Sequence, residues 1–475
     1  MGGKRRACKL SIRKLGSLFG VCCVLYFIIS FGFLSPEQNA SETDKRCFDE
    51  QSVVRHQALG EDKKNDVSCQ DAVCGRVPSP ELQSNFKSGT WNSLYNSPGY
   101  HKRYDVNCSG IIHNNQTIIR QAYEAIRREE VKVPCDEEVV NWTKDCPLYR
   151  RHRRYPLRAL SVEESEYPLA YIIAGHKEAA QIERLLRVIY QPQNFYCIHI
   201  DTKSRSALHQ AIRNLAACFD NVFVASKLEN VQYAGFSRVQ ADINCMRDLV
   251  KHEWKYVINL CGQDFPLKTN LEIVRQMKAY NGLNDIPGIF PEQTQWFIGR
   301  TKFKHEVIRG EVIRTNIEKP DPPHNAKMYF GNAYYAATKE YVVHLLTDKK
   351  ANDIIVYLKD SLSPDEHLWV TLNRYPGVPG GYPNSTWASN VRFIRWTNSD
   401  YYAPCVGKYV RAVCVIGAGY LPYLSSQPHI FVNKLYYSYD PITLQCLEEF
   451  LDYRTVFPES LSEYVQDYPS KNMFP

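Results

Sequence analysis

The chain has 475 residues, of which 44% are hydrophobic, and a formal net charge of +7. This size and composition suit one large or two moderate domains and exclude a polytopic membrane protein. Residues 1–14 carry basic side chains that supply most of this net charge, and the rest of the chain has no basic tract that indicates binding to nucleic acid.

An apolar segment at residues 15–34 contains no charged side chain. About 20 such residues cross the hydrocarbon layer as a helix. Residues 1–14 are basic, whereas the first charges after the segment are acidic, so we expect a signal-anchor with residues 1–14 in the cytosol. A cleaved signal peptide is the alternative, but the stretch is long for one and residues 31–34 form a poor cleavage site.

The region after the anchor carries the marks of the secretory pathway. Residues 35–105 are polar and irregular and predict a stem. Sixteen cysteines, most of them beyond residue 34, indicate an oxidising compartment, and no Cys/His pair follows Cys69 and Cys74 at zinc-finger spacing. Five glycosylation sequons agree with this compartment. Their acceptor positions are Asn39, Asn107, Asn115, Asn141 and Asn384.

Short apolar runs alternate with amphipathic stretches from about residue 168 onward. The runs predict strands at 169–174, 194–200, 222–225 and 256–260. Between them, helices are predicted around 182–189 and at 207–219 and 241–250. This alternation predicts a mostly parallel α/β sheet flanked by helices. Since such sheets bind ligands beyond the carboxyl ends of their strands, the loops at 176–177, 201–203 and 262–266 are expected to form the site.

The segment Ser363-Pro364-Asp365-Glu366 matches a helix start. The pattern predicts Ser363 as N-cap, proline at the first helical position and Glu366 closing a capping box. From pattern alone, Arg411 in a strand-like segment and Lys434 in a loop are ordinary charges.

Four longer segments carry a family resemblance. They are Phe195–Ser204 (FYCIHIDTKS), Ser237–Cys245 (SRVQADINC), Trp254–Asn270 (WKYVINLCGQDFPLKTN) and Ser363–Trp369 (SPDEHLW). Together they resemble the core 2 and I-branching β-1,6-N-acetylglucosaminyltransferases. The resemblance implies a GT-A-like fold in the Golgi and inverting transfer of GlcNAc from UDP-GlcNAc to a sugar C6 hydroxyl.

The resemblance also implies roles for individual residues. Glu366 matches the catalytic carboxylate, which takes the acceptor proton, and a helix start would hold it ionised. Arg411 and Lys434 match side chains that neutralise the leaving diphosphate. Asp201 and Tyr233 match positions that face the nucleoside of the donor.

Further matches concern the acceptor and the cofactors. Trp396 is expected to stack on a sugar face with Arg300 as its polar partner, and Asp264 is expected to contact the acceptor. The chain contains no Asp-x-Asp motif, so we expect no divalent metal and no cofactor. The expected partners are UDP-GlcNAc and a glycan acceptor on a glycoprotein or glycolipid.

The resemblance implies four disulfides and a division of the lumenal part. An N-terminal segment at 106–166 is expected to be tethered to a catalytic domain at 167–456, followed by a tail at 457–475. Cys261 is expected to be free, while Cys47, Cys69, Cys74 and Cys135 form extra stem bridges or join two chains into a homodimer. The implied pairs are Cys108 with Cys446, Cys146 with Cys218, Cys197 with Cys245, and Cys405 with Cys414.

The chain departs from its relatives beside the proposed cations. Tyr420 stands where relatives have Asp, and Leu435-Tyr436 replaces Phe-Asp. A glycan-binding member that has lost turnover therefore remains an alternative, as does a peptide O-xylosyltransferase. For the acceptor, the segments at 284–288 and 299–302 resemble the I-branching members, whereas the segment at 107–110 resembles the core 2 members. Asp285 is a candidate for a displaced acceptor-binding acid.

Overall fold

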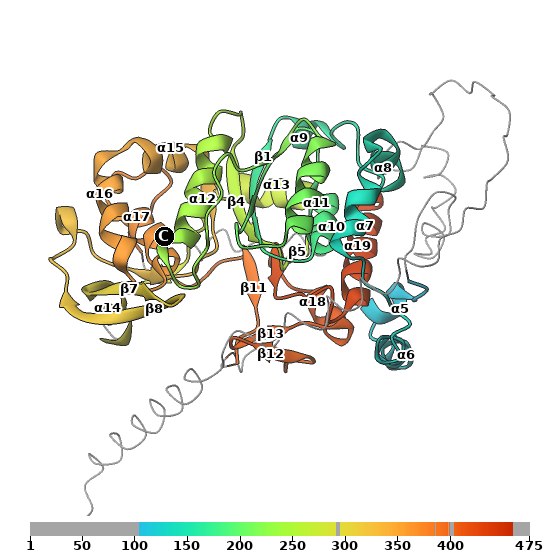
Figure 1. The fold of residues 1–475 in the computed structure, drawn as a ribbon. Coiled ribbons are helices and arrows are strands. Elements are labelled where there is room, and N and C mark those ends of the chain that lie inside the picture. Colours follow the sequence, from blue (N-terminus) through green and yellow to red (C-terminus); the bar gives the residue numbers. More distant parts are fainter. Residues whose placement is uncertain (1–103, 291–294, 385, 398, 400–402, 459–475) are drawn as a thin grey trace, which may run out of the picture. The chain divides into compact units, whose positions relative to one another are not determined.

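The computed structural model describes residues 104–290, 295–384, 386–397, 399 and 403–458 (Figure 1). The predicted cytosolic tail and anchor, nearly all of the stem, Asn39, three stem cysteines and most of the C-terminal tail lie outside these residues. No helix within the described part of the chain is both long and apolar enough to span a bilayer.

The largest sheet has five strands in the order β10-β4-β1-β2-β3. β1 pairs in parallel with β2 and β4, β2 pairs in parallel with β3, and only the edge strand β10 is antiparallel. The prediction of a mostly parallel sheet is therefore confirmed, and each predicted strand is present. The strands are β1 (Leu169–Gly175), β2 (Phe195–Ile200), β3 (Val222–Val224), β4 (Tyr256–Cys261) and β10 (Ala336–Thr338).

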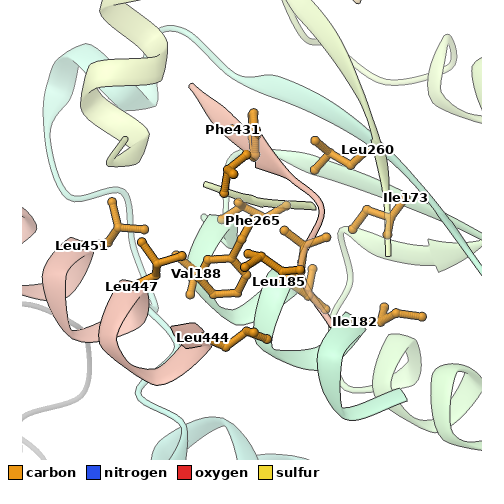
Figure 2. Close-up of a cluster of buried hydrophobic side chains, with 14 of the residues drawn as sticks. Ile173, Ile182, Leu185, Val188, Leu260, Phe265, Phe431, Leu444, Leu447 and Leu451 are labelled. Atoms are coloured by element: carbon orange, nitrogen blue, oxygen red, sulfur yellow. The ribbon is translucent and has the colours of Figure 1, made fainter. Parts of the chain in front are cut away.

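Helices cover both faces of this sheet, as the alternating pattern requires (Figure 1). Along β1, Tyr171 and Ile173 pack into a cluster with α10 (Ala179–Ile189), α11 (Ser206–Ala217) and α19 (Pro441–Val456). Figure 2 shows part of this cluster, including side chains from α10 and α19. Ala170 and Ile172 instead face a second cluster. That cluster includes side chains from α12 (Phe236–Leu249), α15 (Lys339–Thr347), α16 (Lys349–Tyr357) and α17 (Leu368–Asn373).

α12 starts five residues before the predicted helix at 241–250. Gly235 precedes it in an extended conformation, and the helix begins directly at Phe236. Val239, Ile243 and Met246 are buried on one face, so the apolar period that defines the helix extends further back than we predicted.

Smaller sheets surround the carboxyl ends of the main strands. β11 (Arg392–Ile394) pairs with β14 (Phe431–Asn433), which pairs with β5 (Asp264–Pro266). The other strands of the described residues form three two-stranded sheets. They are β6 (Gly288–Ile289) with β9 (Phe330–Gly331), β7 (Phe303–Ile308) with β8 (Glu311–Glu318), and β12 (Lys408–Val410) with β13 (Val413–Val415).

Short helices fill the remaining segments. Before β1 these are α5 (Cys108–Ile112), α6 (Gln116–Arg127), α7 (Asp136–Trp142), α8 (Cys146–His152) and α9 (Val162–Ser165). After β4 they are α13 (Asn270–Ala279), α14 (Gln295–Lys302), η4 (Pro323–Asn325), η5 (Leu358–Asp360), η6 (Pro364–Glu366), η7 (Ala418–Tyr420) and α18 (Leu421–Leu424).

Disulfides attach the N-terminal helices to the rest of the fold. Cys108 in α5 is bonded to Cys446 in α19, and Cys146 in α8 is bonded to Cys218 at the end of α11. Cys197–Cys245 and Cys405–Cys414 are also present, so all four pairs implied by the resemblance occur. Among the described cysteines, Cys135 and Cys261 lie outside these bonds.

The described sequon asparagines are all exposed. Asn107 and Asn115 also cap helices, since their side-chain oxygens accept backbone hydrogen bonds at the starts of α5 and α6. Asn141 and Asn384 lie on the surface as well. These four positions are therefore sterically open to modification.

Candidate active site

The candidate site lies beyond the carboxyl ends of β1 and β4, where a parallel sheet normally receives its ligand. A pocket there is lined by residues that directly follow the two strands: His176, Lys177 and Glu178 after β1, and Gly262 and Gln263 after β4. Two of the three loops that we expected to form the site thus meet at one pocket.

Three cations gather beside this pocket, and we call Lys177, Arg411 and Lys434 the cation group. The ammonium of Lys177 lies 4.2 Å from the ring centre of Tyr436. Burial is the main cause that lowers the pKa of Lys434, and it outweighs Cys261, which raises it; Arg411 and Lys177 lower this pKa further, and Asp264 opposes them. Like charges held together in this way form a receptor for an anion.

Lys177 lies in a loop that we expected to form the site, but neither Lys177 nor Tyr436 was assigned a role. The available signal was the position of Lys177 directly after the first strand. Tyr436 was noted only as a departure from the relatives. Its contact with Lys177 joins segments that are far apart in the sequence, so no local pattern could reveal it.

Arg411 occupies a turn and not the strand that we predicted. Arg411 and Ala412 connect β12 to β13, with φ angles of 52° and 62°. Two consecutive left-handed residues between antiparallel strands match the twist of a tight hairpin, although neither residue is glycine. The amide of Thr397 donates to the carbonyl of Ala412 at 2.9 Å, and the Cys405–Cys414 bond crosslinks the hairpin. Arg411 is therefore presented from an anchored turn.

Tyr233 and Arg411, both predicted to bind the donor, are in contact. The guanidinium carbon of Arg411 lies 4.2 Å from the ring centre of Tyr233, whose side chain is 66% exposed. Tyr233 belongs to the loop between β3 and α12, and Ala234 in that loop has a φ of 58°. This pair therefore presents a flat aromatic surface next to a positive charge.

Asp201 supports the start of the same loop. Its carboxylate accepts from the amides of Lys203 and Val231 at 3.0 and 3.4 Å, and lies 3.1 Å from the ammonium of Lys203. Lys203 in turn donates to the side-chain oxygen of Asn230 at 2.8 Å and to the carbonyl of Val231 at 2.5 Å. Asp201 thus ties the end of β2 to the segment that leads to Tyr233.

Glu366 does not close a capping box, contrary to our prediction. Ser363 has a φ of 47° and makes no side-chain cap, and residues 364–366 form a single 3-10 turn before α17. The proline disfavours a right-handed helical conformation at Ser363. The amide of Ser363 instead donates to the carbonyl of Ala234 at 2.7 Å. This bond joins the Glu366 turn to the loop that carries Tyr233.

The surroundings of Glu366 raise the pKa of its carboxyl to about 7. Burial is the main cause and the neighbouring Asp365 adds to it, whereas Arg300 acts in the opposite direction and hydrogen bonds to the carboxylate. The helix start that we expected to hold this carboxylate is not formed, since a 3-10 turn takes its place. A pKa near neutrality suits a group that must accept a proton during each turnover.

Asp264 cannot contact an acceptor in this structure, which corrects its predicted role. Its side chain is fully buried and lies 3.2 Å from the guanidinium of Arg392. It also accepts from the side chain of Asn433 at 2.8 Å and from the amide of Cys261 at 2.6 Å. Asp264 therefore holds β4, β5, β11 and β14 together beneath the pocket.

Asp285 is likewise structural. It is buried and accepts from the hydroxyl of Tyr280 at 2.6 Å and from the amide of Asn390 at 3.3 Å. Its burial raises the pKa of the carboxyl to about 6. It does not serve as a displaced acid that reaches an acceptor hydroxyl.

The two remaining predicted acceptor residues, Arg300 and Trp396, have different contacts. Arg300, in α14, contacts Glu366 directly. Trp396 is 41% exposed and forms a bridge with Val413, beside the hairpin that carries Arg411. Exposed rings of this kind can stack on a sugar.

The departures from the relatives differ in their environments. Tyr420 is buried, packs against Phe393 and Tyr423, and donates its hydroxyl to the carbonyl of Ala403 at 2.8 Å. Leu435 is also buried. Neither departure replaces a residue of the cation group. Only Tyr436 touches the group, and it does so through its ring.

No group of three or more His, Cys, Asp or Glu side chains in the described part of the chain is arranged to hold a metal ion. Two acidic residues near the pocket lie close to cations: Glu178 lies 3.4 Å from Lys177 of the cation group, and Asp264 pairs with Arg392.

Comparison with known proteins assigns the chain to a family. The model of the Core-2/I-branching enzyme family matches residues 169–424, more than half of the chain. An N-acetyllactosaminide β-1,6-N-acetylglucosaminyl-transferase from Homo sapiens is 44% identical over 345 residues, which cover 70% of this chain and 85% of the relative. A β-1,3-galactosyl-O-glycosyl-glycoprotein β-1,6-N-acetylglucosaminyltransferase 3, also from Homo sapiens, is 39% identical over 78% of this chain and 88% of its own length. The chain therefore belongs to the Core-2/I-branching enzyme family of glycosyltransferases.

Proposed function

We propose that the chain transfers GlcNAc from UDP-GlcNAc to the C6 hydroxyl of a galactose or N-acetylgalactosamine, with inversion at the anomeric carbon. The observation that carries this proposal is the position of Glu366. A carboxyl with a pKa of about 7 lies on a turn whose backbone is bonded to the loop of Tyr233, and Tyr233 lies under Arg411. The turn that carries the proposed base Glu366 is therefore connected to Arg411 of the cation group through the loop of Tyr233. We also propose a GT-A-like architecture for this fold.

In the proposed reaction, Glu366 accepts the proton of the acceptor C6 hydroxyl. The hydroxyl oxygen forms a bond to the anomeric carbon of GlcNAc as the bond from that carbon to the diphosphate breaks. UDP leaves with the electron pair, and one displacement inverts the configuration. This chemistry needs a base but no protein nucleophile.

The cation group is proposed to neutralise the diphosphate as it leaves. Arg411 offers a planar guanidinium, whereas Lys177 and Lys434 act as point charges. Tyr233 and Asp201 are proposed to bind the nucleoside, Tyr233 by its exposed ring and Asp201 chiefly by holding the loop. No divalent metal or other cofactor is required in this proposal.

Activity is therefore expected to survive chelation of divalent metals. Transfer from labelled UDP-GlcNAc should proceed in excess EDTA at close to the rate without it, because protein cations supply the charge that a metal supplies elsewhere. The measurement is product formation with EDTA, with manganese added back as control. Complete loss in EDTA that manganese restores would contradict the proposal.

For the acceptor we favour galactose within poly-N-acetyllactosamine over the disaccharide Galβ1-3GalNAc. The burial of Asp285 supports this preference, since it removes the one candidate for a core 2 type acid in that loop. The chain also shares 44% identity with a relative named for N-acetyllactosaminide.

The purified chain is expected to branch lactosamine chains faster than Galβ1-3GalNAc at equal concentration. Initial rates on both acceptors with labelled UDP-GlcNAc measure this. Efficient branching of Galβ1-3GalNAc with lactosamine left untouched would identify a core 2 enzyme instead. Saturable binding of glycan without transfer to any acceptor would favour the alternative of a glycan-binding member without turnover.

We further propose that the chain is a single-pass type II protein of the Golgi membrane with its catalytic domain in the lumen. Exposed sequons and four disulfides support the lumenal placement. Cys135, which is partly buried and outside these disulfides, is one candidate for a bond to a second copy of the chain.

A further inference from the structure

Trp387 presents an exposed ring from a fixed backbone. Its side chain is 46% exposed. The preceding residue, Thr386, exchanges two backbone hydrogen bonds with Gly288, at 2.6 and 2.9 Å. The hydroxyl of Thr386 also accepts from the amide of Ala388 at 3.0 Å. These bonds fix the backbone on both sides of Trp387, while nearly half of its side chain faces solvent.

A continuous set of contacts leads from this ring to the carboxylate of Glu366. The rings of Trp387 and Phe330 meet edge to face, with centres 5.6 Å apart. The guanidinium carbon of Arg300 lies 5.3 Å from the centre of the same Phe330 ring, and Arg300 contacts Glu366. Phe330 also packs beside His367, the next residue in the chain after Glu366. Two side chains thus separate Trp387 from the proposed base.

We propose that Trp387 stacks on a sugar of the acceptor chain adjacent to the sugar that is branched. This inference rests on the proposed function, because it places the acceptor hydroxyl at Glu366. The C–H face of a hexose is apolar and flat, and a large aromatic ring provides a matching surface with little loss of conformational freedom. Trp387 lies on the Arg300 side of Glu366, whereas Trp396 lies beside the Arg411 hairpin.

The position of Trp387 predicts a dependence on acceptor length. A disaccharide places its galactose at Glu366 without filling the surface over Trp387, whereas a lactosamine hexasaccharide branched at an internal galactose covers it. Replacing the ring should therefore penalise long acceptors only. Loss of one stacking contact corresponds to about a tenfold rise in KM.

The test compares Trp387→Ala, Trp387→Phe and the wild-type full chain. Leu157→Ala is the control, since it removes an apolar side chain that is 63% exposed outside these contacts. For the lactosamine hexasaccharide, Trp387→Ala is expected to raise KM about tenfold with kcat unchanged, and Trp387→Phe is expected to recover most of the loss. KM for UDP-GlcNAc, KM for the disaccharide N-acetyllactosamine and the melting temperature should stay close to wild type.

An unchanged KM for the hexasaccharide, or an equal rise for the disaccharide, would overturn the proposal. A binding measurement separates this outcome from failure of the proposed function. If the wild-type chain transfers sugar to no acceptor, titration of its tryptophan fluorescence with the hexasaccharide still reports glycan binding. Binding that Trp387→Ala weakens about tenfold supports the subsite, and binding that the substitution leaves unchanged refutes it.

Discussion

Replacing Glu366 by Gln is expected to lower the rate of sugar transfer by about 10²-fold or more, with UDP affinity and melting temperature near wild type. The amide keeps the size of the side chain and can still accept a hydrogen bond from Arg300, but it cannot take a proton from the acceptor. The measurement is kcat with saturating UDP-GlcNAc and a lactosamine acceptor, beside UDP binding by calorimetry.

The pH dependence gives this variant an independent check. Because burial raises the pKa of Glu366 to about 7, the wild-type kcat/KM should fall as the pH is lowered through about 7. Asp365 also raises this pKa. The matched control Asp365→Asn should therefore keep kcat within a few-fold and shift the midpoint to lower pH. Near-normal turnover by Glu366→Gln would leave Glu366 with a purely structural role.

Replacing Lys434 by Ala is expected to weaken UDP binding by about 10- to 100-fold, the range for one or two charge-assisted hydrogen bonds. Uridine binding should change little, because Lys434 is proposed to contact only the diphosphate. Calorimetric titration with UDP and with uridine measures both affinities. Equal losses for the two ligands would contradict the assignment.

The melting temperature of the unliganded chain provides a second readout for this variant. Burial and the charges of Arg411 and Lys177 depress the pKa of Lys434 below its unfolded value. Below the pKa of the folded state, Lys434 is protonated and its charge destabilises the fold. Replacing Lys434 by Ala should therefore not lower the melting temperature. Lys349→Ala is the control for loss of a lysine away from the pocket: it removes an ammonium with 85% exposure on α16, which pairs with Asp353 at 2.9 Å.

Arg411→Ala is a less selective test of the same receptor. The residue should also contribute to UDP affinity, but its guanidinium packs on Tyr233. Its loss can therefore disturb the surface that is proposed to bind the nucleoside. For this reason the Lys434→Ala variant distinguishes binding of the diphosphate from binding of the nucleoside more clearly.

The sequence by itself determined the mostly parallel character of the main sheet and the edge expected to carry the site, but not the strand order or the antiparallel strand β10. Alternating strands and helices favour a mostly parallel sheet covered on both faces, and the observed strands agree with the predicted ones. The four motifs also identified the family. These conclusions rest on periodic burial and on continuous segments, both of which are local properties of a chain.

Only the tertiary structure decided the state of individual charged groups. Asp264 follows a strand as predicted, yet Arg392, more than a hundred residues later, buries it in an ion pair. Glu366 matched a capping box, but the bond from Ser363 to Ala234 replaces that geometry and burial raises its pKa. Lys177 meets Tyr436, and Trp387 meets Phe330, although the members of each pair lie far apart in sequence. A side chain's solvation and partners depend on segments brought together by folding, so local sequence patterns do not specify them.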